Sequence, residues 1–131
     1  MKQGGFTLIE LLIVISIIAF LSLLGFFAIG NKIKQARDAD RQTDLYEIRI
    51  GLEQYYIHEI KYPDALTFSN QPLKSIDGQQ IFLDRIHKDP VNLDPYRYTY
   101  IATPSGMPAA YTLCARYESK AGSFCLHNLQ R

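Results

Sequence analysis

The chain has 131 residues, of which 47% are hydrophobic, and its 14 Lys and Arg nearly balance its 13 Asp and Glu. This length suits a single domain. A net charge of +1 excludes a general polyanion-binding protein, because affinity for a phosphate backbone comes from many uncompensated cations.

The N-terminal part is dominated by a 24-residue apolar run, Phe6 to Ile29, in which Glu10 is the only ionisable side chain. As a helix, the run would be about 36 Å long, enough to cross a hydrocarbon core of about 30 Å. A secretory signal peptide would have a shorter apolar region and a small-residue cleavage pattern after it. A plain single-pass anchor explains the length, but it does not explain a carboxylate inside the run, which is costly unless it has a partner.

Glu10 has few possible cationic partners. Lys2 is the only nearby cation in the chain as written. If the chain were cut between Gly5 and Phe6, the new α-amine of Phe6 would lie about one helical turn from Glu10. The amine could then meet Glu10 within one helix or in a staggered neighbouring copy. The second arrangement would make the buried pair an assembly code, because it forms at only one register.

The residues around this position match a known pattern. The run Gly4-Gly5-Phe6-Thr7-Leu8-Ile9-Glu10-Leu11-Leu12-Ile13-Val14 resembles the class III signal of type IV pilins and type II secretion pseudopilins. In that family, a membrane peptidase cuts after the glycine and N-methylates the new terminal residue. The resemblance implies that residues 1–5 are a leader, that Gly5 is the processing glycine, that Phe6 is methylated, and that Phe6 and Glu10 are assembly contacts.

The sequence departs from the family in one respect. Many members carry a proline that kinks the N-terminal helix, but no proline occurs here between Met1 and Tyr62. Gly25 and Gly30 are the comparable weak points, because glycine in a helix costs about 1 kcal/mol relative to alanine.

The helix is expected to continue to residue 59 or 60, because Pro63 disfavours helix at Tyr62. An amphipathic stripe marks its second half: Leu45, Ile48, Leu52 and Tyr55. The mixed charges of residues 31–59, including the pairs Lys34–Asp38 and Arg49–Glu53, predict a solvated face, with contacts between neighbouring subunits as the alternative.

The fold class expected is therefore α+β, with a long N-terminal helix packed on a small antiparallel sheet. Residues 6–30 would form a transmembrane or filament-core helix. Residues 31–131 would form a globular head, with a helical spine over 31–60, a loop over 61–95 and a β-sheet over 96–129.

The loop is rich in turn signals, and Phe82, Leu83 and Ile86 are predicted to pin it against the helix. It also holds oxygen ligands of the kind that Ca²⁺ prefers: Asp84, Asp89, Asn92 and Asp94. Major pseudopilins bind calcium through aspartates in a C-terminal loop, but residues 115–122 contain no aspartate here. We favour Asx turns at Asp89 and Asp94, with calcium as the alternative, and expect no cofactor.

Three strands are expected in the sheet, near residues 96–101, 110–117 and 123–129. If the second turn is centred between Ser119 and Lys120, paired residues have numbers that sum to 239. Cys114 then faces Cys125, and Leu113 faces Leu126 on the opposite side. This register predicts a Cys114–Cys125 disulfide in an exported protein, with two reduced core cysteines as the alternative.

Nothing in the sequence indicates catalysis. His58, His87 and His127 have no Ser or Cys partner at motif spacing, and no phosphate-binding loop or nucleophile elbow is present. The nine tyrosines could stack on DNA bases, but buried rings with bonded hydroxyls around a small core are the favoured interpretation.

The leading hypothesis is a structural subunit, not an enzyme, of a type IV pilus or type II secretion pseudopilus. The resemblance implies a homopolymer, with a prepilin peptidase and N-methyltransferase, an inner-membrane platform, an assembly ATPase and minor pilins as partners. It also implies an inner-membrane location with an extracytoplasmic head before assembly. Three alternatives remain: a minor, tip or DNA-uptake pseudopilin whose head binds a ligand, an anchored hydrolase, and a simple anchored domain. No specific nucleic-acid partner is expected.

Overall fold

The computed structural model describes residues 5–130, and within that range the side chains of residues 24–28 are not described. One helix, α1 (Leu8–Glu59), precedes five strands: β1 (Leu73–Lys74), β2 (Ile81–Leu83), β3 (Thr99–Thr103), β4 (Ala110–Arg116) and β5 (Ser123–His127). The chain divides into an N-terminal unit, Met1–Lys34, and a C-terminal unit, Gln35–Arg131. Residues 1–4 of the predicted leader lie outside the residues that the structure describes.

The predicted long helix is confirmed, and it ends where Pro63 led us to expect. Ile60 follows α1 with φ of 58°, the left-handed conformation that commonly terminates a helix. Its N–H still bonds to the carbonyl of Tyr56 at 2.8 Å. Gly25 and Gly30 both lie inside α1, so neither interrupts the helix in this structure.

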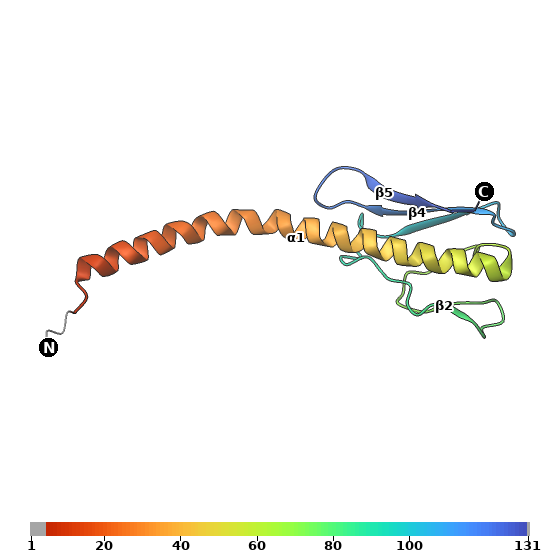
Figure 1. Cartoon of the computed structure of the whole chain (residues 1–131). Coiled ribbons are helices and arrows are strands. Elements are labelled where there is room, and N and C mark those ends of the chain that lie inside the picture. The colour runs from red at the N-terminus through yellow and green to blue at the C-terminus, as the bar shows by residue number, and fades with distance from the viewer. Residues whose placement is uncertain (1–4, 131) are drawn as a thin grey trace. The chain divides into compact units, whose positions relative to one another are not determined.

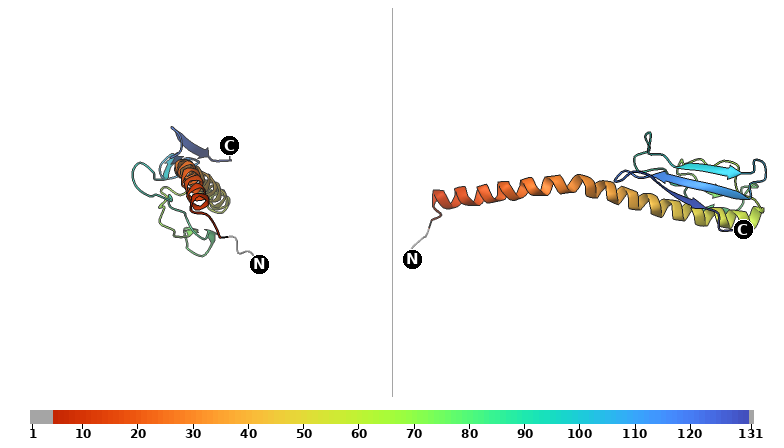
Figure 2. Two further views of the ribbon diagram at one scale, coloured as in Figure 1. Left: turned by 90° about the vertical axis from the view of Figure 1, so that its left-hand side faces the viewer. Right: turned by 90° about the horizontal axis from the view of Figure 1, so that it is seen from above.

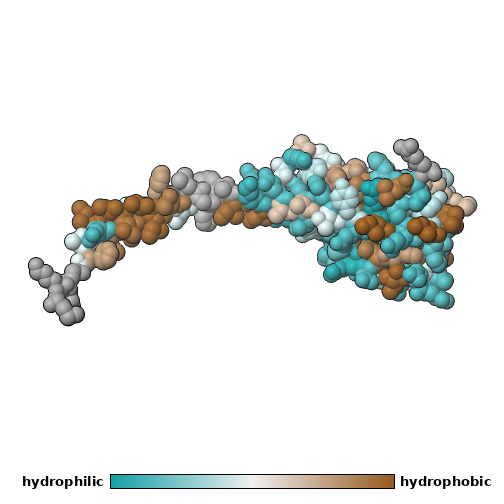
Figure 3. Space-filling view, viewed as in Figure 1, coloured by the Kyte–Doolittle hydropathy of each residue, from teal (hydrophilic) through white to brown (hydrophobic). Residues whose placement is uncertain are grey.

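The N-terminal unit exposes large apolar side chains along α1, from Leu8 at 77% to Leu23 at 62%. Figure 3 shows this surface as brown apolar atoms, whereas the C-terminal unit presents a mainly hydrophilic face with separate brown patches. Among the described residues, no helix combines the length and the apolar character needed to cross a membrane.

The C-terminal unit contains a three-stranded antiparallel sheet with the order β3–β4–β5. The predicted register is confirmed, since Leu113 pairs with Leu126 and Cys114 pairs with Cys125. The first strand begins later than predicted, at Thr99 instead of residue 96. The N–H of Tyr96 donates to the carbonyl of Leu93 at 2.6 Å, which commits Tyr96 to a turn before the strand.

The core lies where α1 meets one face of this sheet. The amphipathic stripe of the helix is buried, with Leu45, Ile48 and Leu52 fully so. Inward-facing strand residues complete the core: Tyr98, Tyr111, Leu113, Ala115 and Leu126. Figure 1 and the right-hand view of Figure 2 show β4 and β5 running beside this part of α1.

A second, two-stranded sheet was not predicted. Strands β1 and β2 form a hairpin inside the segment that the sequence indicated as loop. The hairpin packs on α1 at Gly51, where an added Cβ would lie only 2.9 Å from the Cβ of Leu83. Ile86 is buried, and the Phe82 ring packs edge-on against Tyr55, so the predicted pinning of this segment is confirmed.

Candidate functional site

The start of α1 is closed by a capping box between Thr7 and Glu10. The Thr7 hydroxyl accepts from the Glu10 N–H at 3.3 Å, and Glu10 Oε2 accepts from the Thr7 N–H at 3.2 Å and from the Thr7 hydroxyl at 3.0 Å. The spacing is the Ser/Thr-x-x-Glu pattern of helix N-termini, in which each residue satisfies the other. The sequence analysis did not predict that Thr7 caps the helix, although the Thr-x-x-Glu pattern indicates it.

Gly5 and Phe6 precede the helix. Phe6 is 83% exposed, and a Cβ built on Gly5 would meet no atom within 4 Å. Neither packing nor a left-handed backbone therefore requires a glycine at position 5 in this structure. If glycine is required at position 5, the reason must therefore be an interaction with another molecule, such as recognition by a processing enzyme.

The remaining hydroxyl groups of the apolar run are bonded within the helix. Ser16 donates to the carbonyl of Ile13 at 2.8 Å, and Ser22 donates to the carbonyl of Ile18 at 2.7 Å. Together with the Thr7–Glu10 box, these bonds give every described polar side chain between residues 7 and 23 an internal partner. Such internal satisfaction suits an environment without water, where an unbonded polar group costs several kcal/mol.

The comparisons with known proteins bear on this segment. Residues 1–26 match the family model of the prokaryotic N-terminal methylation motif. This is the class III signal of type IV pilins and pseudopilins. No curated protein and no solved structure matches the chain. The methylation motif supports a pilin-like or pseudopilin subunit, a structural protein that is anchored in a membrane or assembled into a pilus.

The C-terminal unit contains a cluster of charged side chains, and its helical members were predicted to lie on a solvated face. Arg41 is 1% exposed and bonds to Asp89 through Nε at 2.6 Å and Nη2 at 3.0 Å, and to Asp38 through Nη1 at 2.7 Å. Arg37 forms a two-point ion pair with Glu118. For Asp38 and Arg41 the solvated interpretation is wrong, because contacts distant in the sequence bury them.

Asp38 joins this cluster to the turn between β4 and β5. Its Oδ1 accepts from the N–H of Glu118 at 2.8 Å, and its Oδ2 accepts from the N–H of Ser119 at 2.9 Å. Burial alone would raise the pKa of Asp38, but bonds from the Ser119 hydroxyl, these two N–H groups and Arg41 outweigh it and lower the pKa to about 2. Asp38 therefore anchors the β4–β5 turn on the helix as a permanent anion.

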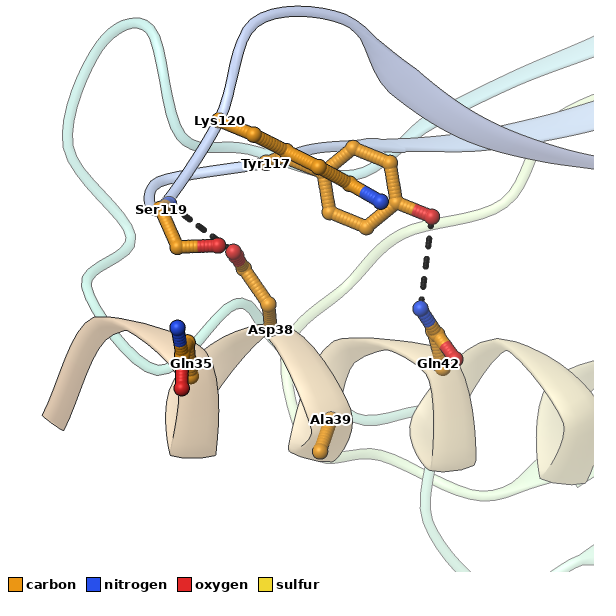
Figure 4. Close-up of a pocket in the computed structure, with 7 residues that line it drawn as sticks. All are labelled: Gln35, Asp38, Ala39, Gln42, Tyr117, Ser119 and Lys120. Atoms are coloured by element: carbon orange, nitrogen blue, oxygen red, sulfur yellow. Dashed lines mark hydrogen bonds between the residues drawn. The ribbon is translucent and has the colours of Figure 1, made fainter. Parts of the chain in front are cut away.

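An open pocket of about 310 Å³ lies beside this anchor. Figure 4 shows Asp38 reaching Ser119, and Gln42 donating to the Tyr117 hydroxyl across the pocket. The Lys120 ammonium lies 4.2 Å from the centroid of the Tyr117 ring. Asp38, Gln42 and Lys120 thus have partners within the protein, and these contacts join the turn to α1.

A third buried carboxylate, Glu53, binds groups near the far end of the sheet. It accepts from the hydroxyls of Tyr62 at 3.0 Å and Tyr111 at 3.2 Å, and from the N–H of Leu129 at 3.0 Å. Burial, followed by these contacts with Glu53, raises the pKa of both tyrosines, so both remain protonated donors. Glu53 was predicted to pair with Arg49, but it binds the two tyrosines instead. The hydroxyls of these buried tyrosines have hydrogen-bond partners, as expected.

The other predicted site residues have ordinary structural surroundings. Asp89 accepts from the N–H groups of Val91 at 2.8 Å and Asn92 at 3.2 Å, so its Asx turn is present, and Arg41 occupies its remaining acceptor positions. Asp94 is exposed and pairs with Arg97 at 3.3 Å. Within residues 5–130, no three His, Cys, Asp or Glu side chains are grouped to hold a metal ion.

The predicted disulfide is present. Cys114 and Cys125 are directly opposed on β4 and β5, with Cα atoms 4.1 Å apart. The bridge closes the turn that carries Glu118 and Ser119, and it therefore restricts the same residues that dock on Arg37 and Asp38. The three histidines remain separate from each other: His58 lies beside Glu59, His127 beside Thr112, and His87 beside Asp44 and Glu47.

Proposed function

We propose that this chain is a structural subunit of a type IV pilus or a type II secretion pseudopilus. The observation that carries the proposal is the methylation motif over residues 1–26, with Gly5, Phe6 and Glu10 at the positions that define it. In this proposal, cleavage follows Gly5, Phe6 is N-methylated, and copies of the chain polymerise through the apolar helix.

The assembly contact is the Glu10 carboxylate of one copy with the Phe6 amine of a neighbour. Thr7 supplies Glu10 with hydrogen bonds before that contact forms, which lowers the cost of holding a carboxylate in an apolar run. The amine adds the opposite charge in the filament. The pair therefore favours one stagger between neighbouring helices over all others.

Before assembly, residues 6–30 are held in the inner membrane and the C-terminal unit is extracytoplasmic. The exposed apolar side chains and the internally bonded serines support this environment for the helix, and the disulfide supports an oxidising compartment for the C-terminal unit. A prepilin peptidase, an inner-membrane platform, an assembly ATPase and minor pilins are the partners that this role requires.

Two measurements test the proposal. Mass spectrometry of the mature protein should find an N-terminus at Phe6 with one added methyl group. A mature protein that begins at Met1, or within the apolar run, would show that the signal is not used.

The second measurement compares Glu10→Gln with Ser16→Ala. Glutamine preserves the capping box and removes only the charge, so we expect cleaved, inserted monomer that does not enter sheared fibres. Ser16→Ala changes another polar residue of the same run and should assemble normally. Fibres of Glu10→Gln at the wild-type yield would refute the ion pair as the assembly contact.

A further inference from the structure

The three-stranded sheet of the C-terminal unit has two open edges. Because its order is β3–β4–β5, each outer strand pairs with β4 on one side only. An open edge presents backbone N–H and C=O groups that can pair with a strand of another molecule. Native proteins usually protect such edges with charged side chains, proline or a β-bulge, so the composition of the two outer strands indicates whether the sheet ends there.

The bonds of the β4–β5 hairpin show which backbone groups of β5 face outward. The N–H of Tyr117 donates to the carbonyl of Gly122 at 3.1 Å, so this opposed pair is hydrogen-bonded. Such pairs alternate along an antiparallel ladder with pairs that have no backbone bonds, and the short Cα–Cα distance of 4.1 Å across the disulfide marks a pair of the second kind. The outward N–H and C=O groups of β5 are therefore those of Ser123, Cys125 and His127.

The outward groups of β3 follow from the same alternation. The carbonyl of Thr103 faces β4, because it accepts from the N–H of Ala109 at 3.0 Å just before that strand begins. Backbone groups alternate in direction along a strand, so those of Tyr100 and Ala102 face the open edge. Within residues 5–130, the outward groups of β3 and β5 have no backbone hydrogen-bond partner.

Neither edge carries the usual protection. The sequence of β3 is Thr-Tyr-Ile-Ala-Thr and that of β5 is Ser-Phe-Cys-Leu-His, so neither contains Lys, Arg, Asp, Glu or Pro. Both strands keep an unbroken register with β4, whereas the small sheet has a register shift between Leu73 and Lys74. Two unprotected edges made of uncharged residues indicate that the sheet continues into another molecule.

The two edges match each other in their side chains. On the side that faces α1, β5 carries Phe124 and Leu126 and β3 carries Tyr100 and Ala102, all of them buried or half-buried. A strand pair that keeps these residues on one side joins apolar with apolar side chains and opposes no like charges. The other side of both strands carries exposed residues: Ser123, Cys125 and His127 on β5, and Thr99, Ile101 and Thr103 on β3.

Strand direction determines which edges can join in a polymer. Both β3 and β5 are antiparallel to β4, so they are parallel to each other. Figures 1 and 2 show β4 and β5 running along α1 in the C-terminal unit. Parallel pairing of β5 in one copy with β3 in the next keeps α1 of both copies pointing the same way, as copies drawn from one membrane require. Antiparallel pairing of β5 with β5 would point the helices in opposite directions and close a two-fold dimer.

We propose that β5 of one copy pairs in parallel with β3 of the next copy. The inference rests on the proposed polymer, which brings copies together with one polarity. Full overlap of the two strands places Cys125 beside Ile101. The Cys125 N–H then donates to the Tyr100 carbonyl, and the Cys125 carbonyl accepts from the Ala102 N–H. The His127 N–H donates to the Ala102 carbonyl. Contact between two different edges of one chain is heterologous, and its repetition generates an open helical filament.

Proline at an outward position tests these backbone bonds. His127→Pro and Ala102→Pro each remove one donor of the contact and leave the bonds to β4, because neither N–H faces that strand. Each should raise the amount of protein left out of sheared fibres about tenfold. His127→Thr and Ala102→Ser keep the donors and should assemble like the wild type. Proline variants that assemble normally, with the disulfide intact and the far-ultraviolet circular dichroism unchanged, would refute the pairing.

Photocross-linking tests the contact without changing the backbone, and it decides the question if a proline variant does not fold. The photoreactive residue p-benzoylphenylalanine replaces His127, or Thr112 of the central strand as the control, in chains co-expressed with the wild type. His127 and Thr112 are paired and lie on the same side of the sheet. Irradiated fibres should contain covalent dimers only with the probe in place of His127, joined to a residue of β3. Fibres without dimers, dimers joined elsewhere, or equal dimers in the control would overturn the contact.

The outcomes separate the two proposals. If the wild-type chain forms no fibres, the proposed function fails and this contact fails with it. If wild-type fibres form and require Glu10, but show neither the cross-link nor the loss of assembly in the proline variants, only the contact between β5 and β3 is wrong.

Discussion

The Arg41 guanidinium holds the Asp89 carboxylate with two parallel hydrogen bonds, and both side chains are buried. The residues are 48 positions apart, so the pair fixes the segment around Asp89 on the helix at a single place. Asp38 accepts from the same guanidinium and from the β4–β5 turn. One arginine thus links the helix, the long connection and the end of the sheet.

Replacement of Arg41 by methionine should be strongly destabilising. The variant leaves the buried carboxylates of Asp38 and Asp89 without their cation, and removal of one partner from a buried ion pair costs about 3–5 kcal/mol. Chemical unfolding of the full chain in detergent, followed by tyrosine fluorescence, measures this cost, because the chain has nine tyrosines and no tryptophan. Arg116→Met, at an exposed position, is the control, and equal stability of the two variants would contradict the role given to Arg41.

Acid stability should depend on Asp38. Because its pKa is lowered to about 2 in the folded chain, its contribution is complete above about pH 4 and is lost as the pH falls toward 2. Asp38→Asn should reduce the free energy of unfolding at pH 7 by roughly 2 kcal/mol and flatten its decline between pH 4 and pH 2. Asp40→Asn removes an exposed carboxylate from the same helix and should keep the wild-type slope. An unchanged slope in Asp38→Asn would show that other groups dominate acid unfolding.

Patterns that are local in the sequence predicted most of the fold. The apolar run and the stripe through Leu45 and Ile48 gave the helix, and Pro63 gave its end. The cysteines gave the register of β4 and β5, because one pairing placed both thiols together and Leu113 beside Leu126. The Thr7–Glu10 box was equally local, and its spacing was sufficient to predict it.

The buried charges were not predictable in the same way. Two of the partners of Asp38 lie at positions 118 and 119, and no local spacing in the sequence connects them with it. A helix with balanced charges looks solvated until the tertiary fold covers one side of it. The hairpin was missed because strands of two and three residues give no alternation that can be distinguished from a loop. Gly51 was the remaining clue, since a glycine inside a helix often marks a close approach.

Gly51→Ala should displace the hairpin. Alanine is favoured over glycine in a helix by about 1 kcal/mol, but the new methyl group would lie 2.9 Å from the Cβ of Leu83. Overpacking of this kind costs about 1–3 kcal/mol, so we expect a net loss of stability and faster hydrogen exchange in residues 73–83. Gly30→Ala is the matched control, because nothing lies within 4 Å of its Cβ, and it should be neutral or stabilising. If both variants stabilised the chain, the hairpin would have to move away from the new methyl group without a measurable loss of free energy of unfolding.

Loss of the disulfide should act on the same contacts as loss of Asp38. The double replacement Cys114→Ser and Cys125→Ser opens a loop of about ten residues, which should lower the free energy of unfolding by about 2–3 kcal/mol. The opened loop carries Glu118 and Ser119, whose N–H groups bond to Asp38, so part of this loss should be shared with Asp38→Asn. In a double-mutant cycle measured by chemical unfolding, the combined loss should therefore be smaller than the sum of the separate losses by at least about 0.5 kcal/mol. Strict additivity would show that the turn stays docked on α1 without its bridge, and that the disulfide stabilises the chain by another route.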